Sequence, residues 1–361
     1  MKVRLPVRNA ILKRRTYEAP AEGRWGKIRL DFNENTAGCS SRVIRALAGM
    51  SPKLLAMYPE YKTPTARLAR YFGVLSKELL LTNGGDDALR VFFDTFVDAG
   101  SRILICEPTF PMYRYYAEIS GAKIDVVRYG TDMAFPLAPV LKQLKLKPRV
   151  LFIANPNNPT GTLIGENEIL QILRAAKNTV VVLDEAYSEF SGFSAIALIR
   201  KFPQLFVART FSKVTGLASL RLGAVIACQE SLAFARRAMP PFPVNLAALV
   251  AAEAALRDGA GMRNYVHRVK ELREWLASEL QAIGIKVFPS AGNFLLANFG
   301  EVGIALFRQL ARKGILLRDR SSDMGPGLVR ITIGTRSEMR LLVQMIKKKW
   351  RSRPKRSAAK T

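Results

Sequence analysis

The segment LFVARTFSKVTGLASLRLG, residues 205–223, begins as an apolar strand and then gathers hydroxyl and cationic side chains. Thr210, Ser212, Lys213 and Arg221 follow the strand closely. Hydroxyls beside a fixed cation suit a phosphate group, while a single lysine among small residues suits an aldehyde. The segment is also compatible with an ordinary charged surface loop. Motifs elsewhere in the chain are needed to distinguish a ligand site from such a loop.

Short apolar segments alternate with helical patterns through the middle of the chain. The expected strands are at 101–107, 123–130, 149–156, 179–187, 205–212 and 220–228. Segments with helical spacing precede or separate them, at 86–100, 111–122 and 166–177. Several strands are apolar on both faces and therefore need helices on both sides. The pattern predicts an α/β protein with a mostly parallel central sheet flanked by helices.

The C-terminal third of the chain has a different pattern. Residues 245–284 have helical spacing, and the shorter segments that follow indicate a smaller α+β unit. We therefore expect a large domain at 37–254, which contains the alternating strands and helices, and a small domain made of 1–36 and 255–346. Residues 347–361 are basic and poor in apolar side chains, which is typical of a disordered tail.

Composition excludes several classes of protein. The 361 residues are 49% hydrophobic, which allows a large core, and no apolar run reaches the length of a membrane span. The three cysteines, Cys39, Cys106 and Cys228, are widely spaced, which argues against a disulfide framework or a metal site. The only histidine, His267, lies in a helical pattern, which argues against Ser-His or Cys-His catalysis. Because the N-terminus lacks the apolar stretch of a secretory signal, we expect a cytoplasmic protein.

The net charge of +27 raises the question of nucleic-acid binding. Much of the excess lies near the two ends of the chain, at 2–15 and 347–360, outside the predicted sheet. Basic tails bind nucleic acid through its phosphates without reading sequence, and this binding weakens with salt. We therefore expect no specific nucleic-acid partner.

Polar residues follow four apolar runs, three of which belong to expected strands. NPNNPTG (155–161) comes after RVLFIA (149–154), DEAY (184–187) after TVVVL (179–183), RTFSK (209–213) after LFVA (205–208), and TNGGDD (82–87) after LL (80–81). In open α/β sheets, ligands bind beyond the carboxyl ends of the strands. We therefore expect these four groups to meet at one ligand.

Pyridoxal phosphate has the functional groups that these residues could bind. Its aldehyde needs an amine, for which Lys213 is the candidate, and its ring nitrogen needs a carboxylate, for which Asp184 at the end of an apolar strand is suited. Tyr187 and Asn158 could donate hydrogen bonds to its phenolic oxygen. Lys213, Asp184 and Tyr187 are therefore the candidate catalytic residues.

The phosphate of that cofactor needs backbone amides at a helix start, together with hydroxyls and cations. The start NGGDDALR offers Gly85, Asp86 and Asp87, with Gly85 permitting close approach of the backbone and an aspartate as the N-cap. The other expected phosphate ligands are Thr210, Ser212 and Arg221, so the opening segment would hold the phosphate and the aldehyde of one molecule.

Sequence motifs along nearly the whole chain resemble those of the fold-type I, class I/II aminotransferases, most closely the histidinol-phosphate aminotransferase branch. The motifs that carry the resemblance are LDFNEN (30–35), MYPEY (57–61), TNGGDDAL (82–89), EPTFPMY (107–113), NPNNPTG (155–161), LDEAY (183–187), RTFSKVTGLASLRLG (209–223), SAGNFLL (290–296) and GILLRDRSSDMGPGLVRITIGT (314–335).

The resemblance implies further ligands and a homodimer. Phe110 would stack on the cofactor ring, and Tyr58 would reach the phosphate of the cofactor in the neighbouring subunit. Arg330 would bind the carboxylate of the substrate, for which a bidentate guanidinium is suited. Arg318 and Tyr17 would bind a phosphate on the substrate.

Two groups of residues have less definite roles. Asn33 and Asn35 either brace the N-terminal segment or touch the substrate, and Asn35 is the candidate substrate ligand of the two. Three tyrosines are expected to pack rather than to bind a ligand, namely Tyr113, Tyr115 and Tyr116.

The activity implied by the resemblance is transamination between an amino-acid-like substrate and 2-oxoglutarate by a ping-pong mechanism, with L-histidinol phosphate as the preferred substrate. Two alternatives remain open because they share nearly all of these residues. They are an aromatic amino-acid aminotransferase, acting on phenylalanine or tyrosine, and a pyridoxal-phosphate-dependent threonine-phosphate decarboxylase.

Overall fold

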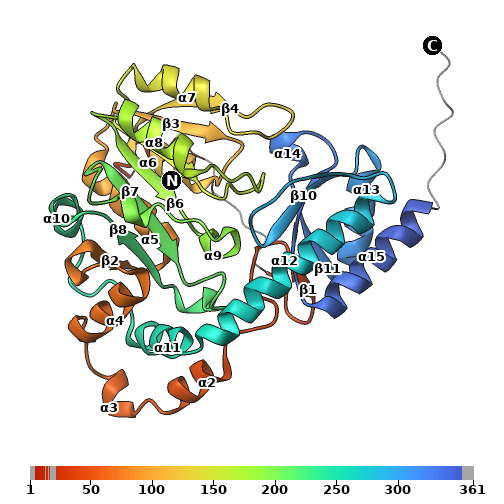
Figure 1. Cartoon of the computed structure of the whole chain (residues 1–361), viewed down its shortest axis with the longest axis horizontal. Coiled ribbons are helices and arrows are strands. Elements are labelled where there is room, and N and C mark those ends of the chain that lie inside the picture. Colours follow the sequence, from red (N-terminus) through yellow and green to blue (C-terminus); the bar gives the residue numbers. More distant parts are fainter. Residues whose placement is uncertain (1–4, 13, 15, 17–21, 352–361) are drawn as a thin grey trace.

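The structure is a computed structural model that describes residues 5–12, 14, 16 and 22–351. It contains two β-sheets with their own helices, which lie side by side in Figure 1. Tyr17, a predicted substrate ligand, lies outside the described residues. Within the described ranges, no helix combines the length and the apolar character needed to cross a membrane.

The larger sheet has seven strands in the order β2-β8-β7-β6-β5-β3-β4. Strands β3 to β7 pair in parallel, whereas β8 is antiparallel to both of its neighbours. The strands are β2 (Leu79–Thr82), β3 (Arg102–Glu107), β4 (Lys123–Arg128), β5 (Val150–Ala154), β6 (Val180–Asp184), β7 (Leu205–Thr210) and β8 (Gly223–Ile226). The prediction of a mostly parallel sheet in an α/β protein is confirmed.

Helices cover both faces of this sheet. In β5, Phe152 packs into the core on one face and Leu151 into the core on the other, as the alternation of side chains along a strand requires. The first core includes side chains of α5 (Gly84–Phe96), α6 (Met112–Ser120) and α10 (Gln229–Arg237). The second core includes side chains of α2 (Ser41–Ala48), α4 (Lys62–Phe72), α7 (Leu137–Leu144), α8 (Glu166–Ala175) and α11 (Leu246–Leu256).

The smaller sheet joins the two ends of the described chain. Its order is β1-β11-β12-β10-β9, and β1 pairs in parallel with β11. The strands are β1 (Ile28–Leu30), β9 (Lys286–Phe288), β10 (Phe294–Asn298), β11 (Ile315–Asp319) and β12 (Leu328–Thr332). Its helices are α12 (Gly259–Gln281), α13 (Val302–Arg312), α14 (Ser321–Met324) and α15 (Arg336–Arg351). The domain boundaries given above remain a prediction.

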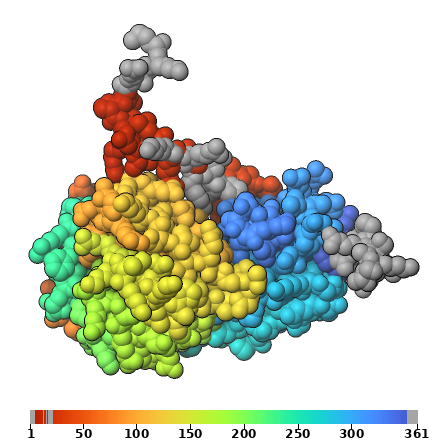
Figure 2. All heavy atoms as spheres, turned by 90° about the horizontal axis from the view of Figure 1, so that it is seen from above, coloured from red at the N-terminus to blue at the C-terminus, as the bar shows by residue number. Residues whose placement is uncertain are grey.

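Short elements complete the fold. The remaining helices are α1 (Asn9–Leu12), α3 (Pro52–Leu55) and α9 (Ser188–Ser191), with 3₁₀ turns at Ser76–Glu78, Ile196–Leu198 and Ala218–Leu220. In Figure 2 the N-terminal residues, in red, project from the surface of the larger unit. Arg8 connects α1 to that surface by donating to the carbonyl oxygen of Ile119.

The expected helical region at 245–284 is confirmed and consists of two helices, α11 and α12. Asp258 lies between them and accepts a hydrogen bond from the backbone of Gly261 as the N-cap of α12. Helix α15 continues to Arg351, so the first part of the predicted tail is ordered. Trp350 explains this, because its ring nitrogen donates to the carbonyl oxygen of Ile283. Residues 352–361 lie outside the described residues.

The two sheets meet around one hydrophobic core. This core contains side chains of the smaller sheet and of α12 and α15, together with Tyr187, Phe190 and Val214 from the larger unit. The N-terminal segment that follows β1 lies at the same junction, since Asn33 bonds to Tyr187 and to Thr332 of β12. A site at this junction therefore takes residues from both sheets.

Candidate active site

A cavity of about 360 Å³ opens at the carboxyl ends of β5, β6 and β7. It brings together most of the predicted site residues, namely Gly85, Asp86, Phe110, Asn158, Asp184, Tyr187, Thr210, Ser212, Lys213, Arg221, Arg318 and Arg330. Three others that the structure describes, Tyr58, Asp87 and Asn35, are not among its lining residues.

The start of helix α5 forms one end of the cavity. Gly84 has a φ of +82°, and a Cβ on it would lie 2.5 Å from the guanidinium of Arg221. Gly223 is equally restricted, because a Cβ there would lie 2.6 Å from the backbone of Gly84. A Cβ on Gly85 would meet only Thr210, at 3.9 Å, so the glycine that permits close approach within the protein is Gly84.

Hydroxyls and a fixed cation lie beside this helix start. The hydroxyl of Thr210 donates to that of Ser212 at 3.0 Å, and Arg221 forms an ion pair with Asp86 at 2.9 Å. The expectation that an aspartate is the N-cap was wrong, because the N-cap is Asn83. Asp87 instead accepts a hydrogen bond from the Asn83 backbone and pairs with Arg90.

Asp184 ends strand β6 inside the cavity. Its carboxylate accepts hydrogen bonds from the hydroxyl of Tyr113 at 2.8 Å and from the backbone of Ala186 at 3.1 Å. Burial raises the pKa of Asp184, although Tyr113, the Ala186 amide and the charge of Lys213 oppose this shift. In the described part of the chain, no lysine or arginine forms an ion pair with this carboxylate. The site therefore favours a cationic ligand group next to Asp184.

The expectation that Tyr113 only packs was incomplete. Its ring stacks on Phe152 and the side chain is fully buried, which agrees with packing, but its hydroxyl holds Asp184. Burial and the Asp184 charge raise the pKa of Tyr113 well above its ordinary value, so the phenol stays protonated and donates.

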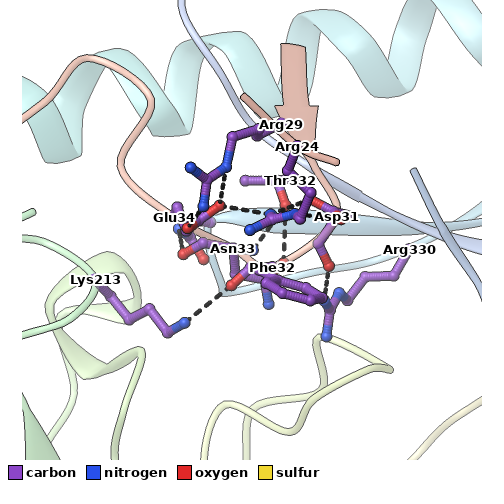
Figure 3. A network of polar contacts seen from close by, with 10 residues as sticks. Arg24, Arg29, Asp31, Phe32, Asn33, Glu34, Lys213, Arg330 and Thr332 are labelled. Atoms are coloured by element: carbon purple, nitrogen blue, oxygen red, sulfur yellow. Dashed lines mark hydrogen bonds and ion pairs between the residues drawn. The ribbon is translucent and has the colours of Figure 1, made fainter. Parts of the chain in front are cut away.

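The N-terminal segment closes the cavity from the side of the smaller sheet. Figure 3 shows Lys213 and Arg330 reaching this segment from opposite sides. The amino group of Lys213 donates to the carbonyl oxygen of Phe32 at 3.0 Å, and a terminal nitrogen of Arg330 donates to that of Asp31. An ion pair with Arg24 fixes the side chain of Asp31 at 2.6 Å.

Three arginines line the same cavity from the side of the smaller sheet: Arg318 in β11, Arg330 in β12, and Arg320 directly after β11. Arg330 is buried and donates to the side-chain oxygen of Asn158 at 2.5 Å. Burial, together with the positive charges of Arg320 and Arg318, lowers the pKa of Arg330 to about 10. An anionic ligand group would offset this burial of positive charge. Arg320 is also buried and forms an ion pair with Asp323.

The remaining predicted ligands lie apart from the cavity. The side-chain amide of Asn35 donates to the carbonyl oxygen of Val214, and its oxygen accepts from the backbone of Ala37, so it braces the segment. Tyr58 is 77% exposed and stacks on Phe242 with ring centroids 4.3 Å apart. A side chain that faces outward in one chain is available to a second chain.

Comparison with known proteins identifies the family. Residues 26–346 match the family described as aminotransferase class I and II. The chain belongs to the class I and II aminotransferases. It is therefore a pyridoxal-phosphate-dependent aminotransferase, and the fold, enzyme class and cofactor predicted from the sequence are confirmed.

Individual relatives have related activities. The aminotransferase is 34% identical to a histidinol-phosphate aminotransferase of Geobacillus sp. (strain WCH70), covering 89% of this chain and 91% of that one. It shares its fold with the histidinol-phosphate aminotransferase of Sinorhizobium meliloti solved with pyridoxal-5'-phosphate, with a TM-score of 0.90, 23% identity and coverage of 97% and 99%. The fold is also that of the L-threonine-O-3-phosphate decarboxylase of Porphyromonas gingivalis, with a TM-score of 0.78, 24% identity and coverage of 90% and 100%.

The cavity of the aminotransferase fits its cofactor. The Asp184 carboxylate favours a protonated ring nitrogen, and the α5 start with Thr210, Ser212 and Arg221 offers donors for a phosphate. Lys213 is the only lysine among the described residues that line the cavity, so it is the amine available to the aldehyde. Phe110 also lines the cavity, and its ring is edge-on to that of Tyr113, with ring centroids 5.9 Å apart.

Several residues of the site were not predicted from the sequence, because their importance depends on tertiary contacts. Phe32 and Arg320 line the cavity, Gly84 admits Arg221, and Tyr113 holds Asp184. A signal existed for Gly84, since two adjacent glycines open the helix and only the second was selected. For Tyr113, the spacing of three residues from Phe110 was available, but three nearby tyrosines on one helix offered no basis for choosing among them.

Proposed function

We propose that this enzyme transfers an amino group between L-histidinol phosphate and 2-oxoglutarate by a ping-pong mechanism. The observation that carries the proposal is the group of three arginines, Arg318, Arg320 and Arg330, at one cavity. A phosphate with two negative charges and a dicarboxylate both need several positive charges, and guanidinium groups bind both geometries in a bidentate manner. The identity to histidinol-phosphate aminotransferases over most of the chain supports the same substrate.

The substrate would be held by the smaller sheet. Arg330 would bind the α-carboxylate of 2-oxoglutarate and of the glutamate formed from it. Arg318 would bind the phosphate of L-histidinol phosphate, with the predicted ligand Tyr17 as its partner. Because Asp31 and Asn158 already orient Arg330, its guanidinium needs little rearrangement to bind an anion.

Catalysis would depend on Lys213, Asp184 and Tyr187. Bound pyridoxal phosphate supplies an electron-withdrawing ring that stabilises negative charge at the α-carbon of the substrate. Lys213 would take the proton from that carbon with its amino group, and Asp184 would keep the ring nitrogen protonated. Tyr187 and Asn158 would donate to the phenolic oxygen, while Gly85, Asp86, Thr210, Ser212 and Arg221 would surround the phosphate.

The absorption spectrum of the purified enzyme with its cofactor tests the substrate. Adding L-histidinol phosphate without 2-oxoglutarate should convert the bound cofactor from its aldehyde form to its amine form, and 2-oxoglutarate should then restore the first spectrum. The same experiment with phenylalanine and with phosphothreonine tests the two alternatives. The proposed substrate would be rejected if phenylalanine, but not L-histidinol phosphate, converted the bound cofactor to its amine form. Release of carbon dioxide from phosphothreonine would also reject it.

The Arg318→Ala variant should distinguish a phosphorylated substrate from an aromatic one. Loss of a charge-assisted hydrogen bond to phosphate should lower kcat/KM for L-histidinol phosphate by roughly 10- to 100-fold. Steady-state kinetics would measure this effect, with Arg308→Ala on the exposed surface of α13 as the matched control. An unchanged kcat/KM in Arg318→Ala would show that Arg318 does not bind the substrate.

We further propose that the enzyme is a cytoplasmic homodimer in which Tyr58 completes the partner's cofactor site. Leu54, Leu55, Met57 and Tyr58 are exposed together in and after α3, and Phe242 is exposed beside Tyr58. Such an apolar surface is more typical of an interface than of a solvated face. Light scattering should therefore give twice the mass of the 40.1 kDa chain. A monomeric mass at micromolar concentration would contradict the proposal.

A further inference from the structure

Asn33 occupies an unusual position in the N-terminal segment. It is 0% exposed, and its φ of 56° lies in the left-handed region, which asparagine tolerates better than most residues. Its side chain bonds to Thr332 of the smaller sheet and to Tyr187 of the larger unit. A buried polar side chain in this conformation therefore connects the cavity wall to both sheets.

The contacts of Asn33 with Thr332 fix the orientation of its amide. The Thr332 hydroxyl oxygen accepts a hydrogen bond from the backbone N–H of Asn33 at 3.0 Å. The hydroxyl then donates its own hydrogen to Asn33 Oδ1 at 3.1 Å. The NH₂ group of Asn33 consequently faces Tyr187 and donates to its phenolic oxygen at 2.9 Å.

A second amide approaches the same phenolic oxygen. Asn158 Oδ1 accepts a hydrogen bond from Arg330, and because a guanidinium only donates, this contact fixes the orientation of Asn158. The NH₂ group of Asn158 therefore faces Tyr187, with its nitrogen 3.4 Å from the phenolic oxygen. The oxygen of Tyr187 thus accepts from two amide donors, the shorter of them from Asn33.

We propose that Asn33 is a positioning residue that makes the Tyr187 hydroxyl a hydrogen-bond donor into the cavity. With two amides donating to its oxygen, Tyr187 has its hydrogen left to give, and the cavity that it lines is where an acceptor can bind. The acceptor would be the phenolic oxygen of pyridoxal phosphate. The inference rests on the proposed role of Tyr187 and adds the residue that determines the direction of its hydrogen bond.

The pH dependence of the absorption of the bound cofactor tests this inference. A donor on the phenolic oxygen stabilises its ionised form, so loss of the donor should raise the pH midpoint of the spectral change. Asn33→Gly removes the amide and keeps a residue that adopts a positive φ without strain. We expect Asn33→Gly to raise the midpoint by about half a pH unit and Tyr187→Phe by about one.

The double variant Asn33→Gly/Tyr187→Phe shows whether Asn33 shifts the midpoint by acting on the Tyr187 hydroxyl or by a general loss of structure. In the Tyr187→Phe background, Asn33→Gly should shift the midpoint by no more than about 0.2 units, because the hydroxyl that it positions is already absent. Asn293→Ala is the matched control, since Asn293 donates to the backbone oxygen of Asn33 and leaves the side-chain amide in place. That variant should leave the midpoint where it is in the unmodified enzyme.

The outcomes test the role of Asn33 separately from the proposed role of Tyr187, on which the inference rests. A shift in Tyr187→Phe without a shift in Asn33→Gly would overturn the role of Asn33 and leave that of Tyr187 standing. No shift in Tyr187→Phe would reject the role of Tyr187 itself. If Asn33→Gly does not fold, Asn33→Asp replaces it, because its carboxylate still accepts from Thr332 but offers Tyr187 an acceptor. An Asn33→Asp shift of equal size with and without the Tyr187 hydroxyl would also overturn the inference.

Discussion

Replacing Lys213 with alanine is expected to lower kcat by at least about a thousandfold, because the substrate then loses the positioned amine that moves its proton. Lys213 is the only lysine among the described residues lining the cavity, and its amino group is 3.0 Å from the carbonyl oxygen of Phe32. Within the described ranges, no other lysine lines the cavity to take over its position. Initial rates of glutamate formation, with the cofactor in excess, would measure the loss.

The Lys213→Ala variant should remain folded and should still bind the cofactor through its phosphate. The donors around Arg221 and the start of α5 do not involve Lys213. Lys177→Ala, an exposed lysine after α8, is the matched control and should keep full activity. A Lys213→Ala enzyme with a melting temperature like that of the control and more than about a tenth of its kcat would contradict the role given to Lys213.

Asp184→Asn is the second variant with a large expected effect. An amide cannot keep a ring nitrogen protonated, so the stabilisation of negative charge on the substrate is lost, and we expect kcat to fall by about a thousandfold. Asn keeps the size of the side chain and can still accept from Tyr113, which bonds to Asp184 at 2.8 Å. Single-turnover kinetics would show whether the loss lies in the chemical step.

The same variant should not destabilise the cofactor-free protein. Burial raises the pKa of Asp184 in the folded state, so the folded state binds the proton more tightly than the unfolded state does. The stabilisation by that proton is complete below the ordinary pKa and is lost as the pH rises through the raised value. At neutral pH the charged Asp184 therefore destabilises the folded, cofactor-free protein. Because the neutral Asn side chain removes this charge, the melting temperature of Asp184→Asn should stay equal or rise. A lower melting temperature together with unchanged kcat would mean that Asp184 is structural.

Much of this site could be predicted from the sequence because its residues follow strands. Asp184 ends β6 and Thr210 ends β7, so the periodicity that predicts the strands also predicts which side chains lie beyond their carboxyl ends. The parallel sheet then brings neighbouring ends to one edge. The mostly parallel arrangement was predictable for the same reason, since the apolar strands alternate with helical segments.

The contacts between distant segments could not be predicted in this way. Tyr113 differs from Tyr115 and Tyr116 only in which side of α6 faces the strand ends, and helical spacing alone does not determine that orientation. Asn33 depends on Thr332, which lies 299 positions away in the sequence. A single sequence contains no local signal for such a pair, because its stability comes from burial and hydrogen bonding after both sheets have formed.

The pairing of β1 with β11 has a consequence for synthesis of the protein. Ile28 pairs with Ile315, so the first strand of the described chain has no partner in the sheet until synthesis has passed residue 315. Segment 31–33 follows β1, and its hydrogen bonds to Lys213 and Arg330 form only afterwards. A nascent chain that stops before β11 therefore lacks the strand that holds β1, and the carbonyl oxygen of Phe32 that accepts from Lys213 is not fixed in place.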